Sequence, residues 1–501
     1  MAGGRVFVIK PAIMPPLTGS IPAAKRIKGL SYIRLNKHYI HLPYLYLGIG
    51  EALLLMIAAI LAQRLDTHLI HNPAVTDSLT FDWIPVVAFS IVMSCCTLSM
   101  GVYSAMVREG AASMMLRTLV SFFLLGSVAM FVINLMWSGN FIRQSFIFWG
   151  IIIASVMVFV ARILFMKVVD IASLKRRVVL YGAGTRAQAL LNELEPEMEV
   201  LGVKIVGCVA NAHEPVKVDS TLLIPAPENW LAFVTQKQIS EIVVSPDERR
   251  RGEGGVFPLN EFIDCKLAGV PSSDALTFCE RELGKIDITL LQPSWMLFSD
   301  GFKYSRRRMI AKRLFDVTLA SVFLLVLWPF MLLTALAVRL ESPGSVLYHQ
   351  LRVGVNGKPF RIYKFRSMRK DAEAGGKAVW AQKNDARITR VGAFIRNTRL
   401  DELPQLYNIL SGSMSFVGPR PERPEFVEEL SAQIPYYDMR HKVKPGLMGW
   451  AQLKYPYGAS VEDAKNKLQY DLYYTKNHSF LMDLLIMIQT VEIILLGKGV
   501  H

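Results

Sequence analysis

Four long apolar stretches near the start of the chain constrain its fold more than any other feature. Each is close to the roughly 20 residues that a helix needs to cross a bilayer. The whole chain is 52% hydrophobic and only 19% charged, which fits a membrane protein better than a soluble one. We therefore expect four transmembrane helices within residues 38–170, at about 43–63, 84–105, 114–136 and 146–169.

Basic residues are distributed unevenly around these stretches. The connection after the first stretch is acidic, and the connection after the third holds only Arg143. Lysines and arginines instead follow the second and fourth stretches, so the positive-inside rule places both ends of the set in the cytoplasm. Residues 1–37, with five basic residues from Lys25 to Lys37, are predicted to be a basic cytoplasmic tail.

The net charge of +15 is compatible with nucleic acid, anionic lipid or an anionic substrate as a partner. The chain has no basic repeat interleaved with aromatic residues and no recognition-helix motif, so we expect no nucleic-acid partner. Its five cysteines show no C-x-x-C spacing, which argues against a zinc site or a disulfide framework.

Residues 176–295 predict a Rossmann-like α/β domain. Residues 178–183 form an apolar run that leads into Gly184 and a helical segment, and further strands are expected at 204–209 and 241–245. The G-x-G-x-x-G fingerprint is incomplete, because Ala187 stands at the third glycine. Asn211 lies where a ribose-binding acid is expected, so a nucleotide-binding domain and a structural or regulatory domain both remain open.

A fifth apolar segment, residues 317–338, has basic residues on both sides and Trp328-Pro329 in its middle. A straight span would carry the second basic cluster across the membrane, against the charge rule. Proline removes a helical hydrogen bond and kinks the helix. We therefore expect a re-entrant membrane helix over about 312–339, broken at Trp328-Pro329, which enters and leaves on one face.

An adjacent carboxylate pair is the strongest candidate for chemistry. Asp401 and Glu402 precede Pro404 and an apolar run, which places them at the start of a helix. One carboxylate can act as nucleophile or base while the other binds a divalent cation, and Mg²⁺ suits such oxygen ligands. Helix capping would also explain the pair, but the cationic side chains of Lys364, Arg366 and Arg420 favour a diphosphate site.

Seven short stretches support this interpretation. They are Lys312–Asp316, Glu341–Gly344, Gln350–Gly354, Gly357–Met368, Leu400–Gln405, Ser415–Pro421 and Lys444–Gln452. In this order, they resemble the catalytic domain of the bacterial phosphoglycosyl transferases, the monotopic-type polyprenyl-phosphate sugar-1-phosphate transferases. The resemblance implies a catalytic domain over 305–501 with a re-entrant helix, behind four membrane helices and a Rossmann-like domain.

The resemblance implies transfer of a sugar 1-phosphate, with a hexose expected, from a UDP-sugar to undecaprenyl phosphate. Asp401 would attack the sugar-bearing phosphorus, UMP would leave, and Glu402 would hold Mg²⁺. The phosphates would be bound by Lys364, Arg366, Arg420 and Lys444. This reaction would initiate exopolysaccharide, capsule or O-antigen synthesis at the cytoplasmic face of a bacterial inner membrane.

The fold expected overall is a membrane protein of α plus α/β class, with a four-helix bundle, a Rossmann-like domain and a mostly helical catalytic domain. The sequence leaves the sugar, the pathway and a homodimer undecided. Two other classes stay open: an oxidoreductase or epimerase that uses the turn at Gly182, and a non-catalytic regulator. His441 and His478 are expected at a surface or an interface and not as a general base.

Overall fold

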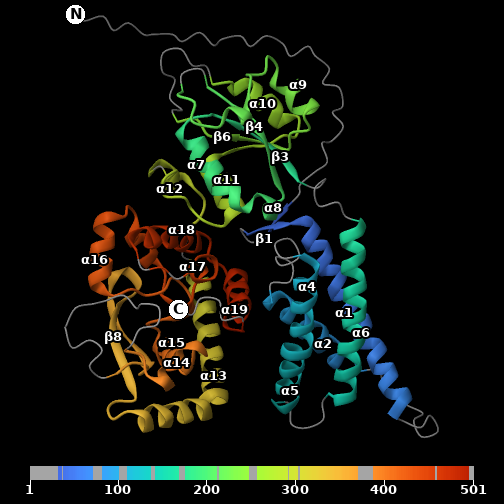
Figure 1. The fold of residues 1–501 in the computed structure, drawn as a ribbon, viewed down its shortest axis with the longest axis vertical. Coiled ribbons are helices and arrows are strands. Elements are labelled where there is room, and N and C mark those ends of the chain that lie inside the picture. The colour runs from blue at the N-terminus through green and yellow to red at the C-terminus, as the bar shows by residue number, and fades with distance from the viewer. Residues whose placement is uncertain are drawn as a thin grey trace, which may run out of the picture.

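The computed structural model describes residues 32–35, 38–70, 82–100, 110–136, 142–168, 175–211, 214–247, 257–291, 293–302, 305–369, 387–456, 458 and 460–495. Figure 1 shows three parts in chain order: a helical bundle, an α/β part and a C-terminal part. The predicted tail lies mostly outside the described residues. Its described end forms strand β1 (Tyr32–Leu35), which pairs antiparallel with β2 (His38–His41).

The helical bundle contains the four predicted apolar helices. They are α1 (Leu42–Ile70), α2 (Trp83–Ser99), a continuous helix of α4 (Gly110–Leu119), π-helical η1 (Val120–Gly126) and α5 (Ser127–Met136), and α6 (Gln144–Val168). Three of them are long and apolar enough to span a membrane. The exception is α2, whose described part has 17 residues, because positions 101–105 of that predicted stretch lie outside the described residues.

A buried ion pair ties the first helix of the bundle to the last. The Nε and Nη2 of Arg162 on α6 donate to the two carboxylate oxygens of Glu51 on α1, at 2.6 and 2.7 Å. Arg162 also contacts the hydroxyl of Thr118 at the end of α4. Buried charges are tolerated only when paired and hydrogen-bonded, so this contact fixes the position of α1 relative to α6.

The middle part is a five-stranded parallel sheet of order β5-β4-β3-β6-β7. Its strands are β3 (Arg176–Tyr181), β4 (Val203–Val209), β5 (Leu223–Ile224), β6 (Glu241–Val244) and β7 (Ser272–Asp274). Alternate residues of β3 face opposite sides, as strand geometry requires: Val178 and Leu180 belong to one buried cluster, Val179 and Tyr181 to another. The three predicted strands are confirmed.

Helices cover both faces of this sheet. They are α7 (Thr185–Leu194), α9 (Trp230–Gln236), α10 (Leu259–Leu267) and α11 (Ala275–Leu283), with short turns η2 (Glu195–Glu197), α8 (Met198–Leu201) and η3 (Ser220–Leu222). Trp230 of α9 and Phe262 of α10 pack edge to face against Tyr181 on one side. Leu190 of α7 and Phe278 of α11 belong to the cluster on the other side.

The C-terminal part is mostly helical, as predicted. It begins with α12 (Pro293–Phe298) and α13 (Arg306–Glu341), followed by the antiparallel hairpin of β8 (Leu347–Val353), η4 (Val355–Gly357) and β9 (Pro359–Phe365). Then come α14 (Arg390–Asn397), η5 (Leu400–Glu402), α15 (Gln405–Ser411), β10 (Ser415–Val417), α16 (Pro424–Gln433), η6 (Tyr437–Lys442), β11 (Gly446–Met448), α17 (Trp450–Lys454), α18 (Val461–Asn477) and α19 (Phe480–Leu495). Strands β10 and β11 pair in parallel.

The longest helix, α13, is 36 residues long and contains Pro329. Figure 1 shows it as two limbs that meet at a bend, which is the effect expected of an internal proline. Trp328, beside this proline, is 58% exposed, and the apolar side chains of both limbs are largely uncovered. The interruption predicted at Trp328-Pro329 therefore takes the form of a bent, uninterrupted helix, and its re-entry into a membrane stays a prediction.

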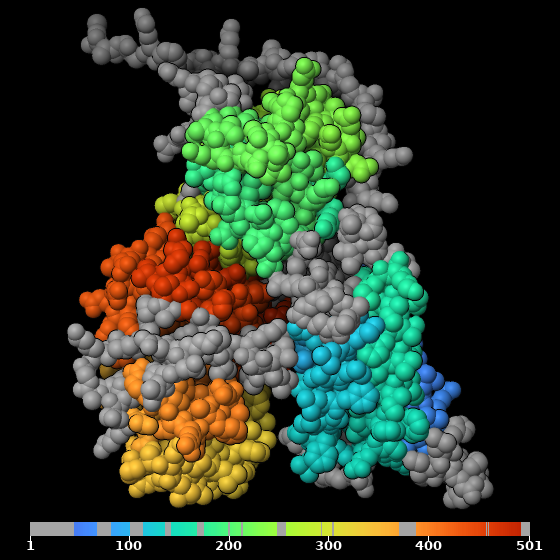
Figure 2. All heavy atoms as spheres, in the orientation of Figure 1, coloured from blue at the N-terminus to red at the C-terminus, as the bar shows by residue number. Residues whose placement is uncertain are grey.

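The middle and C-terminal parts share one buried core. Figure 2 shows the middle part seated directly on the C-terminal part. At this junction the indole N–H of Trp450 donates to the Gly284 carbonyl at 2.7 Å. Lys476 and Asn477 at the end of α18 both donate to Glu280 of α11, each at 2.7 Å. Since these polar groups are buried and satisfied, the two parts are joined rigidly.

Candidate active site

The two carboxylates lie on a short, tightly wound segment. Arg399 adopts a left-handed conformation, with φ of 59°, and turns the chain from α14 into the 3-10 helix η5 that carries Asp401 and Glu402. Non-glycine residues rarely adopt this conformation, and such strain often marks functional segments. Leu400 and Leu403 anchor the segment against the second limb of α13. Both carboxylates are buried, at 6% and 7% exposure.

Glu402 is held by cations from two other segments and by Arg399 of its own segment. Its Oε1 accepts from Lys364 Nζ of β9 at 2.8 Å and from Arg420 Nη2 at 3.1 Å, and Arg399 lies at 3.9 Å. Burial alone would raise the pKa of Glu402, but the charges of Lys364, Arg420 and Arg399 outweigh it and hold that pKa well below its usual range. Glu402 is therefore a permanent anion near neutral pH.

Asp401 is in a different electrostatic state from its neighbour. Burial raises its pKa, the charge of Lys364 opposes that rise, and the negative charge of Glu402 adds to it. Its Oδ1 is buried without a hydrogen-bond partner among the described residues. A buried, unpaired carboxylate oxygen is costly, and it is suited to form a bond with a phosphorus or a metal ion.

The same residues carry the donor set that a magnesium ion requires. Mg²⁺ usually binds through one or two carboxylates and completes its shell with water and substrate phosphates. Asp401 offers an unpaired oxygen, and Glu402 is ionised beside it. No cluster of three acidic, histidine or cysteine side chains occurs within the described ranges, so the protein would supply only part of the shell. This donor set fits Mg²⁺ brought in with a diphosphate.

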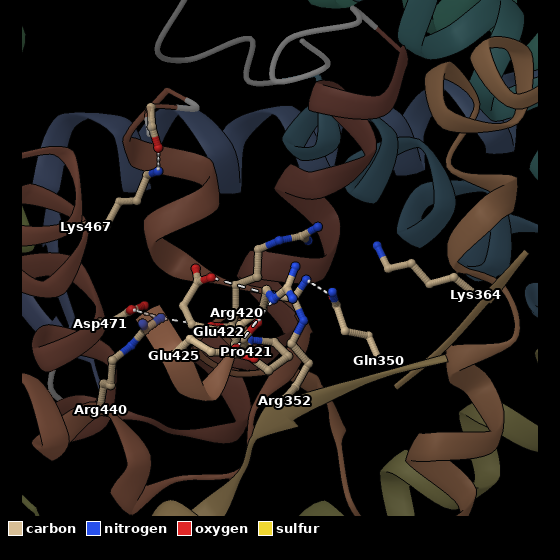
Figure 3. Close-up of polar contacts among 12 residues, drawn as sticks. Gln350, Arg352, Lys364, Arg420, Pro421, Glu422, Glu425, Arg440, Lys467 and Asp471 are labelled. Carbon is tan, nitrogen blue, oxygen red and sulfur yellow. Dashed lines mark hydrogen bonds and ion pairs between the residues drawn. The ribbon is translucent and has the colours of Figure 1, made fainter. Parts of the chain in front are cut away.

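Arg420 reaches the dyad from a rigid turn. It follows β10 in the order Gly418-Pro419-Arg420-Pro421, and the Gly418 amide donates to the Met448 carbonyl of the neighbouring segment at 2.9 Å. A Cβ at Gly418 would collide with the Lys444 carbonyl, so only glycine fits there. Figure 3 shows Arg420 surrounded by further arginines, of which Arg352 donates to the Pro421 carbonyl at 3.0 Å.

Two of the predicted phosphate ligands lie elsewhere. Arg366, just after the end of β9, donates to the carbonyls of Ser342 and Pro343 at 2.7 and 3.1 Å, where it closes the C-terminal end of α13. The strand ends at Phe365, so Lys364 and Arg366 do not continue one alternating face. Lys444 is half-buried, and burial and then the charge of Arg313 lower its pKa. A phosphate-binding role for these two side chains stays a prediction.

Both histidines are buried, so the surface alternative of the expectation is wrong: His441 and His478 are each 8% exposed. His478 directly follows Lys476 and Asn477, which contact the middle part, so it lies close to the interface between the two parts. Burial and then the charge of Arg440 lower the pKa of His441 to about 4, so it is neutral at physiological pH. His441 lies beside Asp438 and His478 beside the Thr475 carbonyl, and that neither acts as a base for the dyad stays a prediction.

Sequence reasoning missed three residues around the turn that carries Arg420: the partly exposed Arg352 and the buried Arg440 and Asp471. Arg352 lies within the motif Gln350–Gly354, which was noted without a role for its arginine. Arg440 and Asp471 form an ion pair of 2.8 Å between η6 and α18. Their separation of 31 residues carries no periodic signal, and only the tertiary fold brings them together.

The glycine turn of the middle part has a separate, self-contained arrangement. The backbone amides of Thr185 and Arg186, at the start of α7, donate to the carboxylate of Asp247 at 2.9 and 2.7 Å. The carboxylate of Glu214 accepts from the Asp247 amide and lies beside Gly184. The position where a dinucleotide-binding fold holds pyrophosphate is thus filled by acidic side chains of the chain itself.

Comparison with known proteins gives matches concentrated in the C-terminal part. Residues 307–497 match a family model described as bacterial sugar transferase. The chain is 44% identical over 200 residues to the exopolysaccharide production protein PSS of Rhizobium leguminosarum bv. phaseoli, which covers 38% of this chain and 98% of that protein.

Two longer relatives match over part of their length. A UDP-N-acetylgalactosamine-undecaprenyl-phosphate N-acetylgalactosaminephosphotransferase of Aeromonas hydrophila is 42% identical over 238 residues, covering 47% of this chain and 55% of that protein. A UDP-glucose:undecaprenyl-phosphate glucose-1-phosphate transferase of Xanthomonas campestris pv. campestris is 43% identical over 195 residues, covering 38% and 40%. The chain thus spans about half of these relatives or less.

Proposed function

Because this chain belongs to the bacterial sugar transferase family, we propose that it transfers a sugar 1-phosphate from a UDP-sugar to undecaprenyl phosphate and releases UMP. The observation that carries the proposal is the pair formed by an unpaired, buried Asp401 and an ionised Glu402 held by Lys364 and Arg420. The names of the relatives support undecaprenyl phosphate as the acceptor.

In the first half-reaction, an Asp401 carboxylate oxygen attacks the phosphorus that bears the sugar. The bond from that phosphorus to the UMP oxygen breaks, and UMP leaves with the electron pair. The product on the protein is a phosphosugar-aspartate, a mixed anhydride. In the second half-reaction, an oxygen of undecaprenyl phosphate attacks the same phosphorus, and the Asp401 carboxylate leaves. Polyprenyl diphosphate sugar is released and the carboxylate is restored.

The side chains around the dyad bind the charged diphosphate of the substrate and exclude water from the site. Lys364 and Arg420 lie within 3.1 Å of Glu402 Oε1, so both are close enough to hold diphosphate oxygens beside it. Glu402 would hold Mg²⁺, which when bound neutralises the charge that develops on the diphosphate. Burial of the dyad favours such electrostatic stabilisation, because a charge acts more strongly in a medium of low dielectric constant.

The membrane arrangement follows from the same proposal. One substrate is soluble and the other is anchored in a bilayer, so the dyad must work at the interface. We infer that α13 enters the cytoplasmic leaflet of a bacterial inner membrane as a re-entrant helix, bent at Pro329. Its exposed apolar side chains on both limbs support this. The sugar stays open, because the relatives include both glucose and N-acetylgalactosamine enzymes; a hexose remains our proposal.

The middle part is proposed to be a Rossmann-like domain without a dinucleotide. Its strand order and parallel sheet support a Rossmann-like fold. The carboxylate of Asp247 at the start of α7 argues against a bound dinucleotide, because it would repel the pyrophosphate. The oxidoreductase hypothesis therefore has no dinucleotide site at this turn. The cations gathered on Glu402 in turn disfavour a purely regulatory protein, which has no need of them.

The test is release of UMP from a panel of UDP-sugars by the protein in nanodiscs, with undecaprenyl phosphate and Mg²⁺ present. Wild-type protein should release UMP with one sugar, and Asp401→Asn should release none while unfolding at an unchanged temperature. UMP release by Asp401→Asn at the wild-type rate would refute the assignment of the nucleophile. If folded wild-type protein releases UMP from none of the UDP-sugars, the proposed transferase activity is refuted.

A further inference from the structure

Arg440 is an arginine whose charge faces the interior. It lies in η6 at 6% exposure, and its partner Asp471 on α18 is 2% exposed. The two pair at 2.8 Å, and the Arg440 Nη1 donates to the Tyr437 hydroxyl at 2.7 Å. A buried ion pair is retained only where its geometry serves the fold or the site, because desolvation cancels most of its attraction.

The nitrogen that pairs with Asp471 also holds the active-site turn. Arg440 Nη2 donates to the backbone carbonyl of Arg420 at 2.9 Å. The neighbouring carbonyl, that of Pro421, is held by Arg352 at 3.0 Å. Figure 3 shows both arginines converging on the turn from different elements. Two consecutive carbonyls, those of Arg420 and Pro421, are thus both held, which fixes the backbone from which the Arg420 side chain extends toward Glu402.

We propose that Arg440, anchored by Asp471, is a positioning residue that sets where the Arg420 guanidinium meets the substrate diphosphate. Among the described residues, Arg440 contacts Tyr437, Asp471 and the Arg420 carbonyl, and it acts on the dyad through that carbonyl. This proposal rests on the proposed function, since it gives the orientation of Arg420 a catalytic consequence. A displacement of about 1 Å in such a group can cost roughly 100-fold in rate.

The consequence for Arg440→Lys follows from its hydrogen bonds. A lysine keeps the charge near Asp471, but its side chain is one atom shorter than that of arginine. Its ammonium therefore cannot take the position of Nη2, from which both the carboxylate and the Arg420 carbonyl are held. The fold should survive because the ion pair survives. We expect kcat to fall roughly 10- to 100-fold with KM for the UDP-sugar changed less than about threefold, since a displaced Arg420 loses more in the transition state than in the ground state.

A double-mutant cycle separates positioning from a general structural effect. In an Arg420→Gln background, adding Arg440→Lys should lower kcat by less than about a further threefold, because the side chain that Arg440 positions is already gone. Losses that multiply in the double variant would overturn the proposal. Arg281→Lys is the matched control, since Arg281 is also a buried arginine in an ion pair, with Glu241 of β6 in the middle part. It should leave kcat unchanged.

A second measurement does not depend on the transferase reaction. Hydrogen exchange of peptides that cover residues 418–423 should be faster in Arg440→Lys than in wild-type protein, with peptides of α15 unchanged. Unchanged exchange at 418–423 would overturn the proposal even in active protein. If wild-type protein is silent on every UDP-sugar but this exchange is faster in the variant, the proposed function fails and the positioning of Arg420 by Arg440 stands.

Discussion

Removal of the Lys364 charge should both slow the reaction and shift its pH dependence. The Nζ of Lys364 lies 2.8 Å from Glu402 Oε1, and its charge also lowers the pKa of Asp401. We consider Lys364→Gln, which removes the charge and keeps a hydrogen-bond donor on a side chain that is one atom shorter. Asp401 and Glu402 would then lie side by side with one compensating cation fewer.

The magnitude follows from the charge that is lost. Two unit charges about 4 Å apart at an effective dielectric constant of about 20 interact by roughly 4 kcal/mol, an upper bound here. The amide still donates one hydrogen bond, and Lys364 is 20% exposed to screening solvent, so about half of that is a reasonable expectation. A loss of about 2 kcal/mol in transition-state binding corresponds to roughly 30-fold in kcat/KM.

The direction of the pH effect is fixed by the reactive form of Asp401, which is the carboxylate. Activity is lost as pH falls through the pKa of Asp401 in the folded protein. Burial raises that pKa and Lys364 opposes the rise, so Lys364→Gln should move the acid limb of the profile to higher pH. The profile of kcat/KM reports the free enzyme, and UMP release measures it.

The matched control is Lys358→Gln, an exposed lysine on the turn of the same hairpin. It should leave both kcat/KM and the acid limb unchanged. The reasoning would be refuted if Lys364→Gln lost less than about threefold in kcat/KM with an unmoved acid limb. It would also be refuted if Lys358→Gln gave the same shift, because the effect would then be one of net charge.

Three further outcomes follow from other contacts. Chelation of divalent metal should abolish UMP release and added Mg²⁺ should restore it; activity that survives chelation would remove Mg²⁺ from the account. Glu51→Ala leaves Arg162 buried and unpaired, which should destabilise the bundle by about 3–5 kcal/mol, and an unchanged thermal unfolding temperature in nanodiscs would contradict this. Glu280→Gln weakens two charge-assisted hydrogen bonds at the junction and should cost roughly 1–3 kcal/mol, measured as faster proteolysis between the middle and C-terminal parts.

The sequence predicted the elements whose signal is local. The apolar helices and the strands β3, β4 and β6 are continuous runs of apolar residues, and each was found where the pattern placed it. Strands β5 and β7 were missed, because one has two residues and the other reads Ser-Ser-Asp. Their position is imposed by the sheet they extend and not by their own composition.

The candidate site shows the same division between residues with a local sequence signal and residues placed only by the tertiary fold. Asp401 and Glu402 share one segment, and their pairing with Lys364 and Arg420 follows the predicted grouping. Arg366 does not join this group, because the strand that carries Lys364 ends one residue earlier and the Arg366 side chain turns to the end of α13. Asp247, whose carboxylate fills the start of α7, follows its own strand by three positions and carries no sequence mark of that role.

The central claim is that Asp401 becomes covalently bound to the phosphosugar, and mass spectrometry of the intact protein tests it most directly. Wild-type protein, given the UDP-sugar that supports UMP release but no undecaprenyl phosphate, should gain the mass of one sugar phosphate. Peptide mapping should place that mass on Asp401, and added undecaprenyl phosphate should remove it. A burst of UMP without any added mass, or the same added mass on Asp401→Asn, would contradict the account.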